Sequence, residues 1–327
     1  MSTSKIMTAA EAVARFVQDG DVAYVGYNCV PYALVHEVVR QRKRGLEVVG
    51  ASQRFQAAYL FLEGCADRTR TAYIGGVMIG ATRGQLVADL IRQGRLKYEE
   101  YTNQALTLMF MAGALGIPYI PTRSLLGTDF LTPAGRDHPW SYLGDAKLRE
   151  AEDPFTGQRV VLLPALRPDV ALYCAQRADA EGNVQAWGVW GEARWALWAA
   201  RKVVVSVEEI VPGEVIRRDP NRTLIPGFKV DAIVHEPFGA HPGAMTGYYD
   251  TDFFFSRLEA EAQLDEAAYH RFVDTWITGV RDRQEYLDRY VATYGLERLR
   301  TVLPDTRLEP TASVSYAFTR RWMAGYR

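Results

Sequence analysis

The sequence is poor in cysteine and has no imbalance of charge. It holds three cysteines among 327 residues, an odd number widely spaced, so a disulfide framework is excluded and small buried thiols in a reducing cytoplasm are expected. The 38 lysines and arginines are matched by 39 aspartates and glutamates, which leaves a formal charge of −1. Such a charge gives no general attraction to nucleic acid or anionic lipid, so we expect neither as a partner.

The sequence also lacks a long apolar run. The longest one, residues 105–120, contains Thr107 and Pro118 and is shorter than the about 20 residues of a membrane-spanning helix. The first residues, M-S-T-S-K-I-M-T, lack the apolar centre of a signal peptide. We therefore expect a cytoplasmic protein without a membrane anchor.

What the chain does contain is a repeated alternation of short apolar strands with helices. Thr8 and Glu11 have the spacing of a capping box, which predicts a first helix that ends at Gly20. The expected strands are 21–26, 46–49, 71–74, 159–163, 169–175, 202–207 and 230–235, and the further helices are 32–42, 56–63, 85–93, 102–115 and 192–201. This order predicts an α/β fold with an open, mostly parallel sheet and helices on both faces.

Two regions depart from the alternation. Residues 122–157 are rich in Gly, Pro, Asp and Thr and predict a loop-rich excursion on the surface. From about residue 253 the chain is mostly helical, and Tyr269, Phe272, Val273 and Trp276 are spaced for one buried face. No linker or internal repeat is visible, so we expect residues 1–327 to form a single domain with a helical C-terminal extension.

The stretch 168–188 is the clearest candidate for the centre of the fold. Residues 169–175 form an apolar run without alternation, which is typical of a strand covered on both faces. The loop that follows, 178–183, contains Gly182 and Asn183, which tolerate a positive φ. Ligands bind at the carboxyl ends of the strands in open α/β sheets, so this loop is a first candidate for lining a site.

A second candidate is the segment 230–243, V-D-A-I-V-H-E-P-F-G-A-H-P-G. Its histidines, His235 and His241, are not one helical turn apart, and Pro237 breaks any helix between them, so a zinc-protease motif is excluded and no metal is expected. Gly239 and Gly243 can free backbone N–H groups for a ligand. A purely structural turn is the alternative.

Other motifs argue against nucleotide binding and serine hydrolysis. Residues 75–84, G-G-V-M-I-G-A-T-R-G, lack the Lys-Ser/Thr of a P-loop and the spacing of a dinucleotide fold. Ser52 is not in a G-x-S-x-G elbow, which disfavours a serine hydrolase. The carboxylates nearest expected strand ends or pocket loops are Glu99, Glu100, Glu208, Glu209 and Glu236. A solvated surface position is more common for such carboxylates than a role as acid or base.

Three segments together make the chain resemble a known family. They are D-V-A-L-Y-C-A-Q-R-A-D-A-E-G-N-V-Q-A-W-G at 169–188, V-V-V-S-V-E-E-I-V at 203–211, and I-P-G-F-K-V-D-A-I-V-H-E-P-F-G-A-H-P at 225–242. With them the chain resembles the A (alpha) subunit of family I CoA-transferases, of the glutaconate CoA-transferase type, from about Lys5 to Tyr294. The resemblance implies an open α/β fold that works with a B (beta) subunit, often as an A₂B₂ heterotetramer.

The family's chemistry implies a nucleophilic glutamate on the B subunit, so no catalytic residue is expected in this chain. That carboxylate attacks an acyl-CoA thioester and forms a mixed anhydride. The CoA thiolate then gives a glutamyl-CoA thioester, from which an acceptor acid takes the CoA. Coenzyme A is thus a substrate, and no permanently bound cofactor is implied. Consistently, residues 50–54 contain no glutamate.

The resemblance also implies a set of binding residues. Tyr27 and Asn28 match the family's glycine-rich turn, which encloses the acyl group, and Gly239, Ala240 and His241 would line the same cleft. The full set of expected substrate- and CoA-binding residues is Gly26, Tyr27, Asn28, Ser52, Gln53, Arg54, Gly75, Gly76, Met78, Asn103, Gly239, Ala240 and His241. Arg54 or Arg83 could pair with a distal carboxylate of a dicarboxylic acyl group, the alternative being an exposed arginine.

Two other functions remain open. The resemblance extends to heteromeric hydrolases that open a ring in β-keto acyl-CoA intermediates of steroid breakdown, whose A chain carries a glutamate near the start of the long apolar helix. That position matches Asn103 here, and a neutral amide cannot act as the base. The third function is a non-catalytic subunit that only stabilises a partner.

Overall fold

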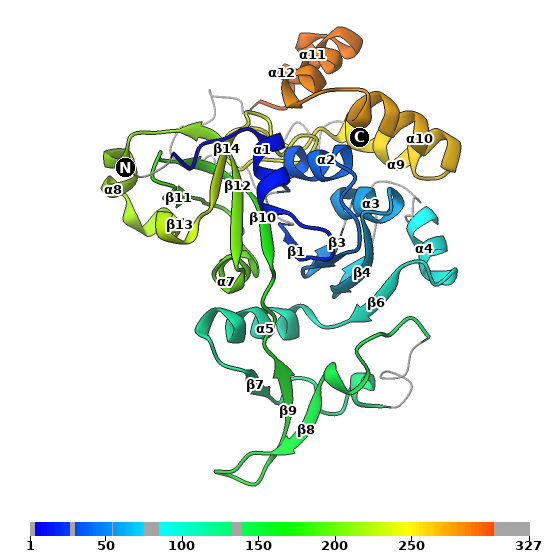
Figure 1. The fold of residues 1–327 in the computed structure, drawn as a ribbon, viewed down its shortest axis with the longest axis vertical. Coiled ribbons are helices and arrows are strands. Elements are labelled where there is room, and N and C mark those ends of the chain that lie inside the picture. Colours follow the sequence, from blue (N-terminus) through cyan, green and yellow to red (C-terminus); the bar gives the residue numbers. More distant parts are fainter. Residues whose placement is uncertain (1–3, 27–29, 54, 75–84, 133–138, 304–327) are drawn as a thin grey trace, which may run out of the picture.

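The structure is a computed structural model that describes residues 4–26, 30–53, 55–74, 85–132 and 139–303. Its main feature is a nine-stranded sheet in which seven strands are parallel, in the order β6, β4, β2, β1, β10, β12 and β14 (Figure 1). Their bounds are β1 Val22–Val25, β2 Leu46–Val49, β4 Ala66–Thr71, β6 Lys97–Glu100, β10 Val170–Ala178, β12 Lys202–Ile210 and β14 Ala232–His235. The predicted open, mostly parallel sheet is confirmed.

The central place of β10 is also confirmed. It pairs with β1 on one side and β12 on the other, and its residues from Val170 to Gln176 are all buried. The strand then folds back through a turn into β11 Val184–Gln185, which is antiparallel and pairs with β13 Thr223–Ile225. Gly182, at φ 92, supplies the left-handed residue of this turn.

Helices cover both faces of the sheet. On one side α1 Ala9–Phe16, α2 Tyr32–Arg40, α3 Phe55–Leu62 and α4 Gln85–Arg92 pack in sequence order. On the other, α5 Asn103–Leu115 packs on α7 Ala193–Ala199, and the Phe110 ring of α5 meets the edge of Tyr24 in β1. The capping box predicted for α1 is present, because the Thr8 hydroxyl accepts from the Glu11 N–H and the Glu11 carboxylate accepts from the Thr8 N–H.

The region after α5 forms a second sheet. The three strands β7 Tyr119–Thr122, β9 Arg159–Pro164 and β8 Arg149–Glu152 are antiparallel and extend away from the main sheet (Figure 1). The loop-rich excursion expected at 122–157 is therefore corrected in part, since it contains β8 and the short helices η1 Asp129–Leu131 and η2 Gly144–Ala146. The strand predicted at 159–163 exists as β9 but belongs to this sheet.

From Phe253 to the last described residue, Leu303, the chain is mostly helical, as predicted. It forms α9 Phe253–Ala262, α10 Glu266–Val273, the π-helical turn η5 Asp274–Thr278, α11 Arg283–Tyr294 and α12 Leu296–Arg300. Tyr269, Val273 and Trp276 are buried, while Phe272 is only half-buried. η5 packs against α2, and Figure 1 shows these helices together on the outer side of α2 and α3.

Two strands of the main sheet differ from the expectation. The predicted strand 71–74 is wrong, because the sheet strand is β4 and residues Tyr73–Ile74 (β5) instead pair with β3, Ser52–Gln53. β4 and β6 carry charged residues between buried ones, so neither shows an apolar run. The remaining short elements are α8 Gly213–Arg218, η3 Pro220–Arg222 and η4 Gly227–Lys229. Within the described ranges, no helix is long and apolar enough to cross a bilayer.

Candidate active site at the carboxyl edge

The parallel strands bring several of the expected site residues to one edge of the sheet. β1, β2, β12 and β14 all end there, so Gly26, Ser52 and the loop 236–243 follow strand ends that share this edge. Six expected residues lie outside the described ranges, namely Tyr27, Asn28, Arg54, Gly75, Gly76 and Met78. Arg83 lies outside them as well.

The exit of β2 is held by a carboxylate that sequence reasoning missed. Glu192, which precedes α7, accepts a hydrogen bond of 3.0 Å from the Ala51 N–H and is buried. Burial raises the pKa of Glu192, and hydrogen bonds from the Ala51 backbone and the Tyr24 side chain oppose this rise. Ser52 and Gln53, which follow Ala51, are buried. The turn is thus fixed by a side chain that lies 141 residues away in the sequence.

Asn103 is in a different setting. It is the first residue of α5, follows the N-cap Thr102, and is exposed. The Thr102 hydroxyl accepts from the Ala105 N–H at 3.0 Å, which caps the helix. The Asn103 side chain is therefore exposed at the start of this helix.

The loop 236–243 has no backbone N–H to spare between residues 238 and 241. The Phe238 N–H donates to Glu208 at 2.7 Å and the Ala240 N–H donates to the Tyr249 hydroxyl at 3.0 Å. The Gly239 N–H and the His241 N–H bond to carbonyls inside the loop. This corrects the expectation of a freed N–H group at Gly239.

The loop has a strained, tightly packed backbone. Phe238 has a φ of 59, in the left-handed region that non-glycine residues rarely adopt, and its ring stacks on Tyr249 at 4.8 Å. A Cβ on Gly239 would lie 2.7 Å from the Glu236 carbonyl oxygen, so only glycine fits there. The Gly239 carbonyl accepts from the Ala33 N–H in the first turn of α2. The loop therefore supports the helix that follows the β1 exit.

Glu208 is the carboxylate on which this support depends. It is buried at the end of β12, where it accepts from the Tyr249 hydroxyl at 2.6 Å and from the Phe238 N–H. Burial raises the pKa of Glu208 to about 7, although these hydrogen bonds and Arg283 act in the opposite direction. The prediction of a solvated Glu208 is wrong, because the side chain is buried and both of its oxygens accept hydrogen bonds from residues after β14.

His241 is enclosed by the C-terminal helices. Its ring has no exposed surface, and its nitrogens contact the Tyr286 hydroxyl at 2.8 Å and the Asp252 carboxylate at 3.2 Å. Burial lowers the pKa of His241, although the hydrogen bond and the charge of Asp252 act in the opposite direction. Within this chain the His241 side chain does not line a cleft; it joins the loop to α11, whose Arg283 donates to the Phe238 and His241 carbonyls.

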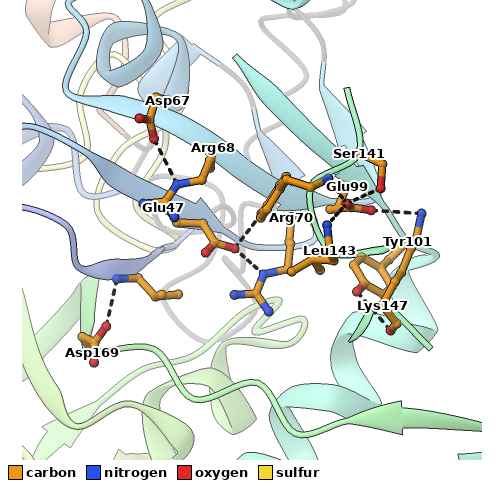
Figure 2. Close-up of polar contacts among 12 residues, drawn as sticks. Glu47, Asp67, Arg68, Arg70, Glu99, Tyr101, Ser141, Leu143, Lys147 and Asp169 are labelled. Carbon is orange, nitrogen blue, oxygen red and sulfur yellow. Dashed lines mark hydrogen bonds and ion pairs between the residues drawn. The ribbon is translucent and has the colours of Figure 1, made fainter. Parts of the chain in front are cut away.

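A row of charged side chains crosses the strands β2, β4 and β6 of the main sheet (Figure 2). The Glu47 carboxylate in β2 pairs with Arg70 in β4 and accepts from the Tyr142 hydroxyl at 2.7 Å. In β6, one oxygen of Glu99 accepts from the Ser141 hydroxyl at 2.5 Å and from the Leu143 N–H at 2.7 Å, and the other lies 3.3 Å from the Lys147 ammonium. The prediction of a solvated Glu99 is wrong too, since it has no exposed surface.

A cavity of about 480 Å³ lies beside Glu99. Its walls come from the end of β6, the segment 127–130 and the segment 140–147, and they include Tyr98, Glu100, Asp129, Phe130 and Trp140. Among the described residues, no three His, Cys, Asp or Glu side chains converge as a metal site would require. The row of charges thus fixes one wall of a cavity near the carboxyl end of β6.

The fold and its carboxyl-edge loops define a class of protein. The coenzyme A transferase family model matches residues 6–236. The chain therefore belongs to the coenzyme A transferase family, which confirms the resemblance seen in the sequence. The crystal structure of glutaconate coenzyme A-transferase from Acidaminococcus fermentans is similar to it with a TM-score of 0.83 and 29% identity, over 93% of this chain and 97% of that one.

Relatives of known name are similar over most of their length. The A subunit of the 3-oxoadipate CoA-transferase of Pseudomonas knackmussii is 31% identical over 86% of this chain and 97% of its own length. The A subunit of the glutaconate CoA-transferase of Acidaminococcus fermentans is 31% identical over 89% of this chain and 93% of its own length. Among the named relatives, the chain thus matches A subunits of CoA-transferases, as the sequence predicts.

Two further relatives differ from these CoA-transferase subunits in length or in activity. An uncharacterized protein of Archaeoglobus fulgidus is 35% identical, but this chain spans only 65% of its length. The cholesterol ring-cleaving hydrolase IpdA subunit of Mycobacterium tuberculosis is 26% identical over 82% of this chain. The hydrolase alternative is therefore represented among the relatives at lower identity than the CoA-transferase subunits.

Proposed function

We propose that this chain is the A subunit of a heteromeric CoA-transferase that moves CoA from an acyl-CoA to a carboxylic acid. The observation that carries the proposal is the fit to the glutaconate CoA-transferase structure over nearly the whole of both chains. Two A chains would assemble with two B chains in the cytoplasm. The buried thiols of Cys65 and Cys174 suit a reducing compartment.

The reaction would use a glutamate of the B chain. Its carboxylate attacks the thioester carbonyl and expels the CoA thiolate, which forms a mixed anhydride. The thiolate then attacks the glutamyl carbonyl and releases the first acid, and the acceptor acid reverses both steps on the resulting glutamyl-CoA thioester. Coenzyme A enters and leaves as part of the substrates.

This chain would form one wall of the site. Gly26, Ser52, Gln53 and Asn103 are the described residues that we assign to that wall, together with Tyr27, Asn28, Arg54, Gly75, Gly76 and Met78. The loop 236–243, through Gly239, Ala240 and His241, would act behind them by fixing the first turn of α2. The Glu192 carboxylate at the β2 exit is already bonded to Ala51 and is not the nucleophile in this proposal.

The test uses this chain purified together with a B-type chain. The complex is incubated with acyl-CoA, treated with borohydride, and digested for mass spectrometry. We expect a reduced glutamate on the B chain and acid-dependent exchange of CoA. A reduced glutamate on this chain refutes the proposal, and release of free CoA without an acceptor acid supports the hydrolase instead. Full activity of the B chain without this one supports a purely stabilising role.

A further inference from the structure

We infer that the cavity beside Glu99 receives the guanidinium or ammonium group of a basic side chain from the B chain. This inference rests on the proposed function, because it presumes that a B chain docks at the carboxyl edge. The cavity measures about 480 Å³, which is ample for one long side chain. The contact between this cavity and the basic side chain would fix the orientation of the B chain on this chain.

The charge of the walls selects a cation. Among the described residues, the lining contains the carboxylates of Glu99, Glu100 and Asp129, and against them one ammonium group, that of Lys147. Lys147 already lies 3.3 Å from Glu99, so the two exposed acids at the rim, Glu100 and Asp129, leave the described part of the lining negative. A carboxylate or phosphate would be repelled there.

The aromatic walls favour an organic cation. Tyr98, Phe130 and Trp140 line the cavity, and the faces of aromatic rings attract guanidinium and ammonium groups. Lys147 shows that these walls suit a cation, because its ammonium lies 5.7 Å from the centre of the Phe130 ring. A metal ion needs converging ligands, and no such group is present in the described part of the chain.

A buried carboxylate forms part of the wall of the cavity. Glu99 accepts hydrogen bonds from Ser141, Tyr142 and Leu143 through the same oxygen, Oε1. The other oxygen, Oε2, is buried and accepts no hydrogen bond from the described residues, although the Lys147 ammonium is near it. The Glu99 carboxylate and the Lys147 ammonium thus form a fixed, charged part of the cavity wall (Figure 2).

The place of the cavity points to the partner chain as the source of the cation. Glu100 is the last residue of β6, and the exposed Asn103 of the proposed site begins α5 three residues later. A B chain that supplies its glutamate at this edge must also cover the neighbouring surface. The exposed Glu100 and Asp129 at the rim of the cavity are complementary in charge to a basic residue on the B chain.

The experiment compares the binding of the B chain to two matched double variants. In Glu100→Gln/Asp129→Asn both rim acids are neutral, and in the control Glu266→Gln/Glu297→Gln two exposed acids of the C-terminal helices are neutral instead. Affinity is measured by calorimetry at low and high salt. We expect the rim variant to bind about tenfold more weakly at low salt and to lose most of its salt dependence. The control is expected to bind like the unchanged chain.

Equal affinity of the rim variant and the unchanged chain would overturn the inference. A second arm adds agmatine, a free guanidinium, which we expect to compete with the B chain. If agmatine binds the isolated chain without affecting the B chain, the cavity serves a small cation and the inference is again overturned. If the unchanged chain binds the B chain in a salt-dependent way but the complex does not exchange CoA, the proposed function is refuted. The contact between the cavity and the B chain is then still supported.

Discussion

The Glu208 carboxylate accepts a hydrogen bond of 2.6 Å from the Tyr249 hydroxyl, and both side chains are buried. The same hydroxyl accepts from the Ala240 N–H, while Glu208 also accepts from the Phe238 N–H. Two side chains thus hold two successive parts of the strained loop 236–243. Because the loop supports the first turn of α2, the geometry of the carboxyl edge depends on this pair.

Tyr249→Phe is expected to lower the free energy of unfolding by about 1–3 kcal/mol, because the buried Ala240 N–H loses its acceptor. Urea denaturation measures the change. The control is Tyr119→Phe, at a half-exposed tyrosine of β7, where a change within about 0.5 kcal/mol is expected. Equal stability of the two variants would show that the hydroxyl does not hold the loop.

Glu259 gives a prediction on pH. It is buried in α9, its Oε1 accepts from the Tyr59 hydroxyl at 2.5 Å, and burial raises its pKa from 4.5 to about 8. Between these values the folded chain keeps a proton that the unfolded chain releases, so the free energy of unfolding falls as the pH rises. The slope is up to about 1.4 kcal/mol per pH unit. Glu259→Gln is expected to lack this dependence.

Unfolding by urea at several pH values across this window checks the prediction. The stability of Glu259→Gln relative to the unchanged chain is expected to increase as the pH rises. In Tyr59→Phe the bond that lowers the Glu259 pKa is absent, so the loss of stability is expected to extend to higher pH. Parallel curves for the unchanged chain and Glu259→Gln would contradict the assignment.

Sequence alone was sufficient where burial depends on the local pattern. The central strand β10, the capped helix α1 and the helical C-terminal region were all predictable, because an apolar run or a capping box is a local signal. The strand β4 was not, since the charged Arg70 lies between the buried Thr69 and Thr71 and is only partly exposed where it pairs with Glu47 on another strand. Such a pairing has no signature in either segment.

The same reason explains the errors at the site. Glu99 and Glu208 look like ordinary surface carboxylates in the sequence, and each is buried by residues that lie more than 25 positions away. Glu192 was missed because its partner is the backbone N–H of Ala51, and a backbone contact cannot be predicted from residue types. The edge of the sheet that carries the site was predictable, whereas the side chains that hold its loops required the tertiary structure.

The buried pair of Glu99 and Lys147 gives a third prediction. Lys147→Met leaves the Glu99 carboxylate buried without its neighbouring ammonium, and we expect a loss of about 3–5 kcal/mol in the free energy of unfolding. The matched control is Arg300→Met, which removes the exposed pair with Glu297 and is expected to cost less than about 1 kcal/mol. A similar small loss in both variants would mean that Glu99 does not need Lys147.

The last prediction concerns turnover. Glu192 fixes the Ala51 N–H at the exit of β2, directly before Ser52 and Gln53 of the proposed site. Glu192→Ala removes the acceptor, and displacement of this turn is expected to lower kcat/KM of the complex with the B chain by about 10- to 100-fold. Glu192→Gln keeps an oxygen that can accept from Ala51, so it is expected to retain most of the activity.

Binding of the B chain separates a local effect from a general one. Glu192→Ala is expected to form the complex with unchanged affinity, because Glu192 is buried within this chain and presents almost no surface to a partner. Activity is assayed as acid-dependent CoA exchange, with calorimetry for assembly. Full turnover in Glu192→Ala would show that the β2 exit is not part of the site. Equal losses of activity in the Ala and Gln variants would show that the site requires the charge of Glu192 rather than its hydrogen bond to Ala51.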